Sequence, residues 1–519
     1  MTASMNWGEE LATTYNRYGH RIGIVDHEGS HSVASIIERA SGIAAHLVTL
    51  GVSSGDYVAT IFHNSALAAS ASYAVSLLGA AEVPINPLLS EKELQHALRC
   101  AHVKIVLVDG ADPKPPVGSA PLEDIRPVAS GQLNPSLWAD VAPEAPSRIV
   151  FTSGTTGAAK GAIHSHLGRW TANLLLRAAL PFLPDRSNRI LLMTPFSHGS
   201  SLLTFAYLAE GASVYLLRGV DPAIVLPLIA ASSLTEIFAP PTVLAKLSDA
   251  SEMTPEIGVK GKLRTILTGT APLAPRLYAK AVKQFGEIVR VTYGKSEIFN
   301  PITVLDPGET AQAYAEPAQP GLCVGWPAPG VRIQIRDDEG GPVTPGETGY
   351  IFLHSPHLSL GYMTSDGEKL LASGEFHETG DVGWIDRKGR LFLSSRQSDM
   401  MKSGGYKVSP DEVERALSGA LPSVDLVVLG FPSEYWGEVI TVVARKPPKD
   451  WETQLEPALA EMTAYKRPRL FVETNELPVN SIGKISRALL RQWLVDNFDF
   501  VEKPRPALAR KPDVAGAQR

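Results

Sequence analysis

The chain has 519 residues, of which 44% are hydrophobic and 20% are charged, a composition typical of a globular protein with more than one domain. Its formal net charge is −6 and its basic residues are scattered along the sequence, which argues against a nucleic-acid-binding surface. The two cysteines, Cys100 and Cys323, match no metal-binding or redox spacing, and a reducing compartment is the simplest interpretation.

The N-terminal residues and the apolar runs do not indicate export or membrane insertion. The first ten residues, MTASMNWGEE, lack a basic segment followed by an apolar core, so we expect no secretory signal and a cytoplasmic location. The longest weakly polar run, residues 65–81, contains four serines and is shorter than the roughly 20 apolar residues that span a bilayer. We predict a buried helix of small residues there, and no membrane span.

Strand-like and helix-like segments alternate in the N-terminal part of the chain. Strand-like runs at 57–62, 103–108 and 189–193 alternate with helical windows such as 91–100. This pattern is typical of parallel strands that are joined by crossover helices.

The pattern changes after about Gly321. Short strand-like runs at 331–335, 349–353 and 391–393 are separated by glycine and proline, which indicates a β-rich lobe.

A third pattern begins at Pro410 and is typical of a small α+β domain. Helix-like and strand-like segments alternate there, at 411–417, 425–429, 439–444 and 451–463. The last stretch, 503–519, is rich in Pro, Ala and Arg, and we expect it to be disordered.

The segment Phe151–Gly161, FTSGTTGAAKG, exposes an unusual amount of bare backbone. It holds three glycines, four hydroxyls and one lysine, and we expect it to join a strand at 147–150 to a helix. Backbone N–H groups of such residues can point into one concavity and cradle a phosphate, and Lys160 adds a positive charge. It is not a Walker A loop, because Ala159 stands where that motif has glycine. Taken alone, a hydroxyl-rich turn without a ligand is an equal alternative.

The segment resembles the phosphate-binding motif of the adenylate-forming superfamily, which includes acyl-CoA synthetases, adenylation domains and luciferases. Further segments resemble that family's other motifs in the same order. They are Pro195–His198, Gly269–Leu273, Thr292–Glu297, Gly346–Glu347, Thr379–Asp381, Ser395–Tyr406 and Asn480–Lys484.

The resemblance implies an α/β fold with a large N-terminal domain and a small mobile α+β C-terminal domain. The large domain would hold two Rossmann-like mixed sheets flanked by helices, plus a β-barrel-like lobe. We place the two domains at residues 1–397 and 399–502, followed by the tail 503–519. Ser398 then lies at the hinge, where most relatives carry Asp or Lys.

The resemblance also implies a site for ATP with Mg²⁺. Glu297 would supply a hard oxygen to Mg²⁺, Asp381 would accept hydrogen bonds from the ribose hydroxyls, and Lys484 would reach the carboxylate and the α-phosphate. The residues implied to bind the nucleotide are Thr152, Ser153, Gly154, Thr155, Thr156, Gly157, Lys160, Gly269, Thr270, Ala271, Pro272, Tyr293, Gly294, Ser296, Asp381 and Arg396.

A second set of residues resembles the thiol-binding side of the family. Lys402, Gly404 and Gly405 resemble the segment that lines the pantetheine tunnel, and Trp436, Tyr465 and Arg467 resemble the residues that hold the CoA nucleotide in aryl-CoA ligases. Free CoA is therefore favoured over a carrier-protein phosphopantetheine. The alternative is that Trp436 and Tyr465 anchor the core of their domain.

The acid is the least specified part of the site. Phe196–Gly199 contains no carboxylate, so an α-amino acid would leave its ammonium buried and unpaired. Thr292 stands where malonate-type relatives carry Arg. An aromatic, alicyclic or medium-length aliphatic acid is favoured, with Phe299 as one expected pocket wall. His198 would flank the carboxylate or gate the tunnel, or be a buried structural histidine. Lys295 is either an anionic contact or exposed to solvent.

The sequence thus predicts an AMP-forming acid–thiol ligase with Lys484, Glu297 and His198 in catalytic roles. ATP, Mg²⁺ and a small carboxylic acid would give acyl-AMP and pyrophosphate, and CoA would then release the thioester and AMP. An acyl-AMP ligase that loads a carrier protein, a luciferase-like oxygenase and a nucleotide-sensing module are the alternatives. A homodimer is left open.

Overall fold

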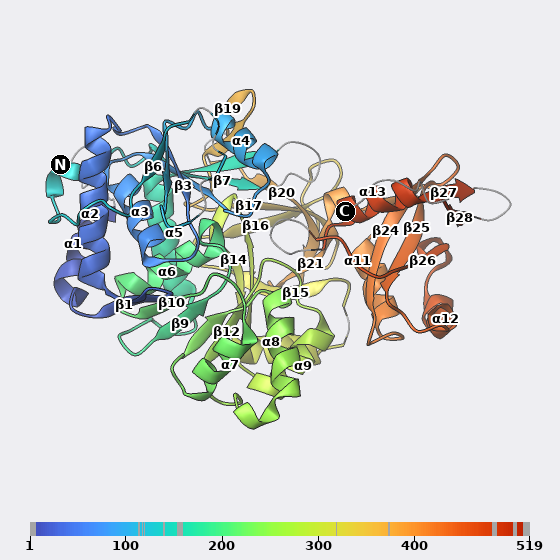
Figure 1. The fold of residues 1–519 in the computed structure, drawn as a ribbon. Helices are drawn as coiled ribbons and strands as arrows, with labels where there is room; N and C mark the ends of the chain where they lie inside the picture. Colours follow the sequence, from blue (N-terminus) through green and yellow to red (C-terminus); the bar gives the residue numbers. More distant parts are fainter. Residues whose placement is uncertain are drawn as a thin grey trace. The chain divides into compact units, whose positions relative to one another are not determined.

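The computed structural model forms two compact units (Figure 1). Unit 1 comprises Met1–Pro317, Val324–Ile333 and Leu353–His377, and unit 2 comprises Ala318–Cys323, Gln334–Phe352 and Glu378–Arg519. The structure describes residues 7–112, 115–116, 118, 120–138, 141–152, 159–317, 319–371, 374–479, 485–501 and 506–511. The domain boundary that we place at residue 398 stays a prediction.

The first sheet of unit 1 is mixed. Its strand order is β19-β18-β8-β7-β4-β3-β5-β6. The strands from β7 to β6 run parallel, whereas β8, β18 and β19 pair antiparallel. The bounds are β3 (Tyr57–Ile61), β4 (Ala81–Ile85), β5 (Ile105–Val108), β6 (Leu122–Asp124), β7 (Pro146–Thr152), β8 (Lys160–Ser165), β18 (Gly361–Thr364) and β19 (Gly367–Leu370).

The second sheet of unit 1 is also mixed, and its central strands are parallel. Within this unit the order is β15-β14-β13-β12-β11-β9-β10-β1-β2. The strands from β13 to β1 run parallel, and β14, β15 and β2 are antiparallel to their neighbours. The bounds are β1 (Ile22–Asp26), β2 (Gly29–Ser32), β9 (Arg189–Leu192), β10 (Ser213–Leu216), β11 (Glu236–Phe238), β12 (Thr265–Thr268), β13 (Val289–Lys295), β14 (Ile298–Leu305) and β15 (Leu322–Pro327).

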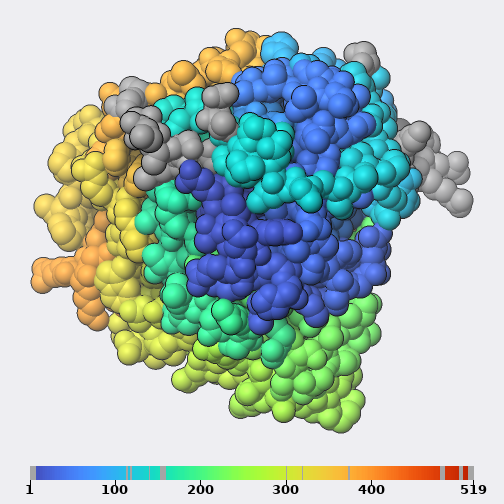
Figure 2. All heavy atoms as spheres, turned by 90° about the vertical axis from the view of Figure 1, so that its left-hand side faces the viewer, coloured from blue at the N-terminus to red at the C-terminus, as the bar shows by residue number. Residues whose placement is uncertain are grey.

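Ten α-helices accompany these strands in the described part of unit 1. The N-terminal residues, coloured blue, form part of the molecular surface that Figure 2 shows. The predicted small-residue helix is α3, which begins after the N-cap Ser65 and is buried along its length. Among the described residues, no helix is both long and apolar enough to cross a bilayer. The bounds are α1 (Trp7–Tyr18), α2 (Val33–Thr49), α3 (Ala66–Leu77), α4 (Glu91–Cys100), α5 (His166–Ala179), α6 (Ser201–Ala209), α7 (Pro222–Ala230), α8 (Pro241–Met253), α9 (Pro275–Phe285) and α10 (Pro307–Ala315).

Unit 2 contains the strand run β16-β17-β20-β21 and a small sheet of order β23-β22-β25-β24, in which β26 also pairs with β25. The bounds are β16 (Arg332–Arg336), β17 (Gly349–His354), β20 (His377–Ile385), β21 (Leu391–Arg396), β22 (Met401–Ser403), β23 (Tyr406–Val408), β24 (Asp425–Ser433), β25 (Gly437–Arg445), β26 (Leu470–Thr474), α11 (Pro410–Ser418), α12 (Trp451–Glu461) and α13 (Arg487–Asn497).

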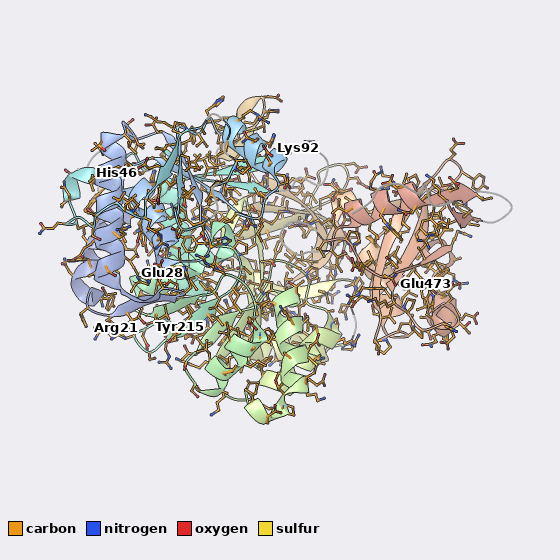
Figure 3. The ribbon with its side chains drawn as sticks, viewed as in Figure 1. Arg21, Glu28, His46, Lys92, Tyr215 and Glu473 are labelled. Carbon is orange, nitrogen blue, oxygen red and sulfur yellow. The ribbon has the colours of Figure 1, made fainter. Side chains whose placement is uncertain are left out.

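Helices cover both faces of this small sheet. Successive residues of β24 alternate between two cores: Val428 packs with α11 and α12, whereas Val427 and Leu429 pack with α13. Trp451 is buried in the first core, and its indole N–H donates to Glu473 at 2.9 Å. Glu473 is labelled in Figure 3. Side chains of the strand point alternately to the two faces of the sheet, and helices cover both faces, which explains the α+β pattern predicted for this region.

Two expectations from the sequence require correction. The segment after the glycine-rich loop is the strand β8 rather than a helix, because its residues pair with both β7 and β18. Within the tail that we expected to be disordered, Ala507–Arg510 form a strand, β28, which pairs with β27 (Phe498–Val501).

Candidate active site

Three of the predicted motifs lie at one edge of the second sheet of unit 1. Because β9, β11, β12 and β13 are parallel, their carboxyl ends meet at the same edge. Pro195–His198 follows β9, Gly269–Leu273 follows β12, and Thr292–Glu297 runs from β13 to β14. Ligands of open α/β sheets bind at this kind of edge.

The predicted adenine loop has a constrained backbone. A Cβ at Gly269 would lie 2.7 Å from the carbonyl oxygen of Thr292, so the close approach of the two strand ends requires glycine. The next residue, Thr270, has φ +69°, a left-handed conformation that is uncommon for a β-branched residue. Ala271 is half-buried and Pro272 is exposed. Both features constrain the backbone at the start of this loop.

The predicted adenine-stacking residue, Tyr293, is largely covered. Tyr293 is only 8% exposed. The pairing of β13 with β14 shifts register between Tyr293 and Lys295. Gly294 and Lys295, which end β13, and Ser296 in the turn beyond it are half-buried. Base stacking and core packing of Tyr293 both remain predictions.

A tyrosine that the sequence analysis did not single out holds the Glu297 carboxylate. The hydroxyl of Tyr362 donates to Glu297 Oε1 at 3.0 Å and lies 3.4 Å from His377 Nε2. The N–H of Ser359 donates to the Glu297 carbonyl at 2.7 Å. Burial and the adjacent Glu297 carboxylate raise the pKa of the Tyr362 phenol, so this hydroxyl stays a donor at neutral pH.

The same tyrosine also approaches Lys160. Lys160 is exposed at the start of β8, and its Nζ lies 6.0 Å from the centre of the Tyr362 ring, within range of a cation–π contact. The antiparallel pairing of β8 with β18 accounts for this approach, since it sets Tyr362 opposite Ala162. A cation and a carboxylate from two distant motifs therefore meet around one tyrosine.

The rest of the predicted phosphate loop cannot be placed from the structure. Ser153, Gly154, Thr155, Thr156 and Gly157 lie outside the described residues, as does the side chain of Thr152.

His198 lies in an irregular helical turn. The turn Phe196–Ser200 is π-helical, and His198 itself has φ −121° and ψ −139°, outside the helical region. Its carbonyl accepts a hydrogen bond from Ser201 Oγ at 2.8 Å, and the residue is half-buried. His198 is thus placed at the edge of the sheet, and its role stays a prediction.

The predicted ribose residues are neighbours in unit 2. Asp381 in β20 and Arg396 in β21 are directly paired across the strands, and Arg396 Nε lies 3.8 Å from Asp381 Oδ1. Within β20 the Asp381 N–H donates to Thr379 Oγ1 at 3.1 Å. Asp381 is 7% exposed as a residue, whereas the Arg396 side chain is 54% exposed. An exposed guanidinium beside a fixed carboxylate can reach a ribose or a phosphate.

The predicted tunnel segment is a tight hairpin. Gly404 and Gly405 have φ +57° and +85° and join β22 to β23, and this turn geometry accounts for both glycines without a ligand. A Cβ at Gly404 would lie 3.3 Å from the Trp436 ring. Lys402 is exposed, and its N–H donates to Glu438 at 2.7 Å.

The three residues predicted to hold the CoA nucleotide have separate partners. The guanidinium carbon of Arg469 lies 4.3 Å from the centre of the Trp436 ring. The rings of Tyr465 and Tyr406 stack with their centres 4.2 Å apart. Arg467 donates from Nε and Nη2 to the carbonyls of Met462 and Ala460, both at 2.9 Å. These carbonyls lie at the end of α12, so Arg467 caps that helix. Arg469, which the sequence analysis missed, is the arginine that contacts Trp436.

The hinge region is tied to the helix that follows the predicted catalytic lysine. Ser398 lies in a short 3₁₀ turn, Gln397–Asp399, and Asp399 pairs with Arg487 at 3.1 Å. Arg487 is the first residue of α13 and also pairs with Asp411 and Glu414. Lys484 itself lies outside the described residues.

The described residues contain no group of three or more His, Cys, Asp or Glu side chains that would hold a metal by themselves. Glu297 would therefore have to bind Mg²⁺ together with phosphate oxygens and water, which is the coordination that this ion commonly takes in nucleotide sites.

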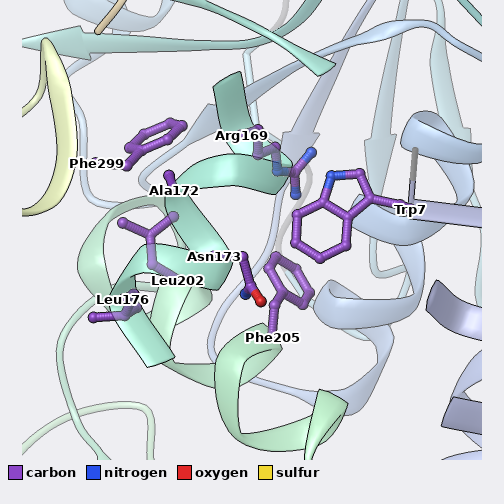
Figure 4. A pocket seen from close by; sticks show the side chains of 8 residues that line it. All are labelled: Trp7, Arg169, Ala172, Asn173, Leu176, Leu202, Phe205 and Phe299. Atoms are coloured by element: carbon purple, nitrogen blue, oxygen red, sulfur yellow. The ribbon is translucent and has the colours of Figure 1, made fainter. Parts of the chain in front are cut away.

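A small cavity lies between α1, α5, α6 and β14 of unit 1 (Figure 4). Phe299, one of the expected pocket walls, contributes to it. The lining residues are Trp7, Arg169, Ala172, Asn173, Leu176, Leu202, Phe205 and Phe299.

Comparisons with known proteins show the family and the fold of the chain. A model of the AMP-binding enzyme family matches residues 11–363. The chain is 28% identical to 4-chlorobenzoate–CoA ligase of Arthrobacter sp over 524 residues, covering 96% of this chain and 97% of that protein. It is also 28% identical to the fatty acid–[acyl-carrier-protein] ligase ScoC of Streptomyces coeruleorubidus, covering 89% and 92%.

The fold matches a solved structure of the same family type. ATP-bound MatB from Rhodopseudomonas palustris superposes with a TM-score of 0.82 at 26% identity, covering 95% of this chain and 99% of that chain. Both have a mixed α/β fold, which in this chain comprises several mixed sheets and a small C-terminal sheet. From the extent of the family match, the chain belongs to the AMP-binding enzyme family.

Proposed function

We propose that this adenylate-forming enzyme is an AMP-forming acyl-CoA synthetase. It would activate a small carboxylic acid with ATP and transfer the acyl group to CoA. The observation that carries the proposal is the contact of Tyr362 with both Lys160 and Glu297, because it joins the phosphate motif to the carboxylate motif at the edge of the sheet. The similarity to a CoA ligase over 96% of the chain supports the choice of thiol.

The first half-reaction requires two anions to meet. The carboxylate attacks the α-phosphate in line and pyrophosphate leaves, so catalysis consists mainly of positioning and charge stabilisation. Lys160 and the backbone of its loop would hold the phosphates, Asp381 and Arg396 the ribose, and Lys484 the oxygens at the new bond. Mg²⁺ bound at Glu297 would neutralise charge on the departing pyrophosphate.

The second half-reaction requires a thiol to reach the acyl-adenylate. In the proposal the C-terminal domain turns about Ser398 and presents the hairpin at Gly404 and Gly405 to the pantetheine arm. Trp436 would receive the CoA adenine, and the Arg469 guanidinium on the same indole would pair with a CoA phosphate. Arg467, which caps α12, would support this surface.

A carrier-protein ligase is the second candidate, because the chain is also 28% identical to ScoC, although over 89% of its length rather than the 96% covered by the CoA ligase. The two candidates differ only in the thiol. Free CoA and a phosphopantetheine-loaded carrier protein should therefore be compared with the same acid, and thioester formation should be measured. Faster acylation of free CoA is expected, whereas faster acylation of the carrier would overturn the CoA assignment.

A panel of carboxylic acids, read by pyrophosphate release, tests the proposal as a whole. We expect release that depends on ATP, on Mg²⁺ and on at least one aromatic, alicyclic or aliphatic acid. ATP binding without pyrophosphate release for any acid would favour a nucleotide-sensing module. Oxygen consumption with an acyl-adenylate would favour a luciferase-like oxygenase instead.

A further inference from the structure

The cavity in unit 1 combines an apolar lining with buried polar atoms that have no partner among the described residues. These atoms are Trp7 Nε1, Arg169 Nε and Asn173 Oδ1. Their residues are 3%, 1% and 5% exposed, respectively. Buried polar atoms are almost always paired, so three of them around one cavity indicate that something polar binds there. The cavity has room for about one water molecule or one terminal oxygen atom.

The surroundings of Arg169 add a charge that is not fully compensated. Glu82, Arg148 and Arg169 are each 1% exposed, and the single Glu82 carboxylate serves both guanidinium groups, at 3.3 Å and 3.6 Å. The hydroxyls of Ser72 and Ser76 accept hydrogen bonds from the two terminal nitrogens of Arg169, so its Nε is the nitrogen left for a ligand in the cavity. Burial, together with the neighbouring Arg148, lowers the pKa of Arg169 to about 10, yet the group stays charged at neutral pH. Two buried cations with one anion favour an added acceptor.

The aromatic rings hold Arg169 in position. Its guanidinium carbon lies 5.4 Å from the centre of the Trp7 ring and 5.3 Å from that of Phe205. Figure 4 shows the Arg169 guanidinium and the Trp7 nitrogen next to each other. The two donors therefore come from rigid, mutually packed side chains, and such groups select a ligand by position.

The cavity is lined by two elements that follow motifs of the predicted site: β14, which follows Glu297, and α6, which follows the turn of His198. Phe299 is two residues beyond Glu297, and Leu202 is four residues beyond His198. Both form apolar parts of the wall. An acid held with its carboxyl near Glu297 and His198 would have its apolar body against these side chains and its far end toward Arg169.

We propose that the cavity binds an oxygen atom at the tail of the acid, the end remote from the activated carboxyl. This inference rests on the proposed function and names the substrate class: an acid with an apolar body and a hydroxyl or keto oxygen at its far end. The tail oxygen accepts hydrogen bonds from Trp7 Nε1 and Arg169 Nε. A hydroxyl additionally donates to Asn173 Oδ1, so hydroxylated acids are preferred over keto acids.

The test uses matched acids that differ only in the tail. Benzoates, phenylacetates, cinnamates and straight-chain acids are each prepared with a hydroxyl, a keto group or a methyl at the far end. The kcat/KM for pyrophosphate release is measured with the full-length protein. For at least one body length, we expect the hydroxylated acid to exceed its methyl counterpart by roughly tenfold, because the methyl group leaves the buried donors unpaired.

Three variants assign the preference to the cavity. Trp7→Phe keeps an aromatic ring but removes one of the two donors, so it should lower the hydroxyl-to-methyl ratio. Asn173→Leu removes only the acceptor, so it should abolish the preference for hydroxylated over keto acids while both still exceed the methyl acid. Trp451→Phe is the matched control: it removes a buried indole N–H in unit 2, which contributes no residue to the cavity lining, and should keep the wild-type ratio. A melting curve for each variant confirms folding, and the wild-type comparison of acids stands even where a variant fails to fold.

Two outcomes would overturn the proposal, and they differ in what they say about the enzyme. If methyl-tailed acids are used as well as hydroxylated ones at every body length, the cavity holds a buried water only and the ligase assignment is unaffected. If no acid releases pyrophosphate, the substrate class and the ligase function are both wrong.

Discussion

At the scale of single residues, the hydroxyl of Tyr362 decides how the Glu297 carboxylate is presented. The tyrosine is 65 residues away from Glu297 along the chain, and only the pairing of β18 with β8 brings it close to the phosphate motif. A hydrogen bond to a charged group contributes about 1.5–3 kcal/mol, more than a neutral one. Fixing one carboxylate oxygen should leave the other oriented for a metal.

We expect Tyr362→Phe to raise the Mg²⁺ concentration needed for half-maximal pyrophosphate release by roughly tenfold, since the carboxylate loses a donor of about 1.5 kcal/mol. The expected change is in the Mg²⁺ requirement more than in the KM for the acid. Tyr350→Phe is a matched control, because Tyr350 also donates to a carboxylate, Asp338, at 2.7 Å. Equal Mg²⁺ requirements for the two variants would remove Tyr362 from the metal site.

At the scale of elements, one guanidinium joins three segments of unit 2. Arg487 at the start of α13 pairs with Asp399 of the hinge turn and with Asp411 and Glu414 of α11, and its Nε donates to the Val428 carbonyl at 3.0 Å. One cation cannot neutralise three carboxylates. Burial, with repulsion from Asp411, therefore raises the pKa of Glu414 from 4.5 to about 7, although Arg487 opposes the shift.

This raised pKa predicts a pH dependence of stability. Between pH 4.5 and about 7, Glu414 holds its proton in the folded chain and loses it in the unfolded one. Its contribution to the free energy of unfolding is therefore full below pH 4.5 and declines as the pH rises toward 7, by at most about 3 kcal/mol. Glu414→Gln cannot titrate and should lose this decline.

Urea unfolding at several pH values between 4.5 and 7 measures the effect. Glu412→Gln is the control on the same helix, where Glu412 pairs with Lys466 on the surface. We expect the control to keep the wild-type slope. A slope that is the same in Glu414→Gln and the wild type would show that Glu414 is already ionised in the folded chain.

The elements differ in how far the sequence predicts them. Segments with a clear period were predicted at the right places, such as the helix at 91–100 and the strand at 425–429, because local burial decides them. The strand β8 was predicted as a helix, since its residues are fixed by two partner strands that lie far away in sequence. Tyr362 and Arg469 were missed for the same reason: their contacts are long-range and no motif marks them.

At the scale of the whole molecule, the proposed reaction needs groups from both ends of the chain. The motif at Lys160 and the sheet edge at Glu297 belong to unit 1, whereas Asp381 and Arg396 belong to unit 2. The family match covers residues 11–363, and the C-terminal part is covered by the relatives that align over nearly the full length. The proposal assigns adenylation to the side of the C-terminal domain that carries Lys484 and thioester formation to the side that carries Gly404 and Gly405. Activity measurements on variants test this assignment.

Lys484→Ala separates the two half-reactions. If Lys484 acts on the carboxylate and the α-phosphate as proposed, removing its positive charge should slow adenylate formation by roughly 100- to 1,000-fold. Thioester formation from a supplied acyl-adenylate should stay close to the wild-type rate, because that step needs the thiol side of the domain. Both rates are measured in single-turnover experiments with the same acid. Lys449→Ala, which alters an exposed lysine of unit 2, is the control and should change neither rate. An equal loss of both half-reactions would show that Lys484 maintains the structure of the domain rather than serving adenylation.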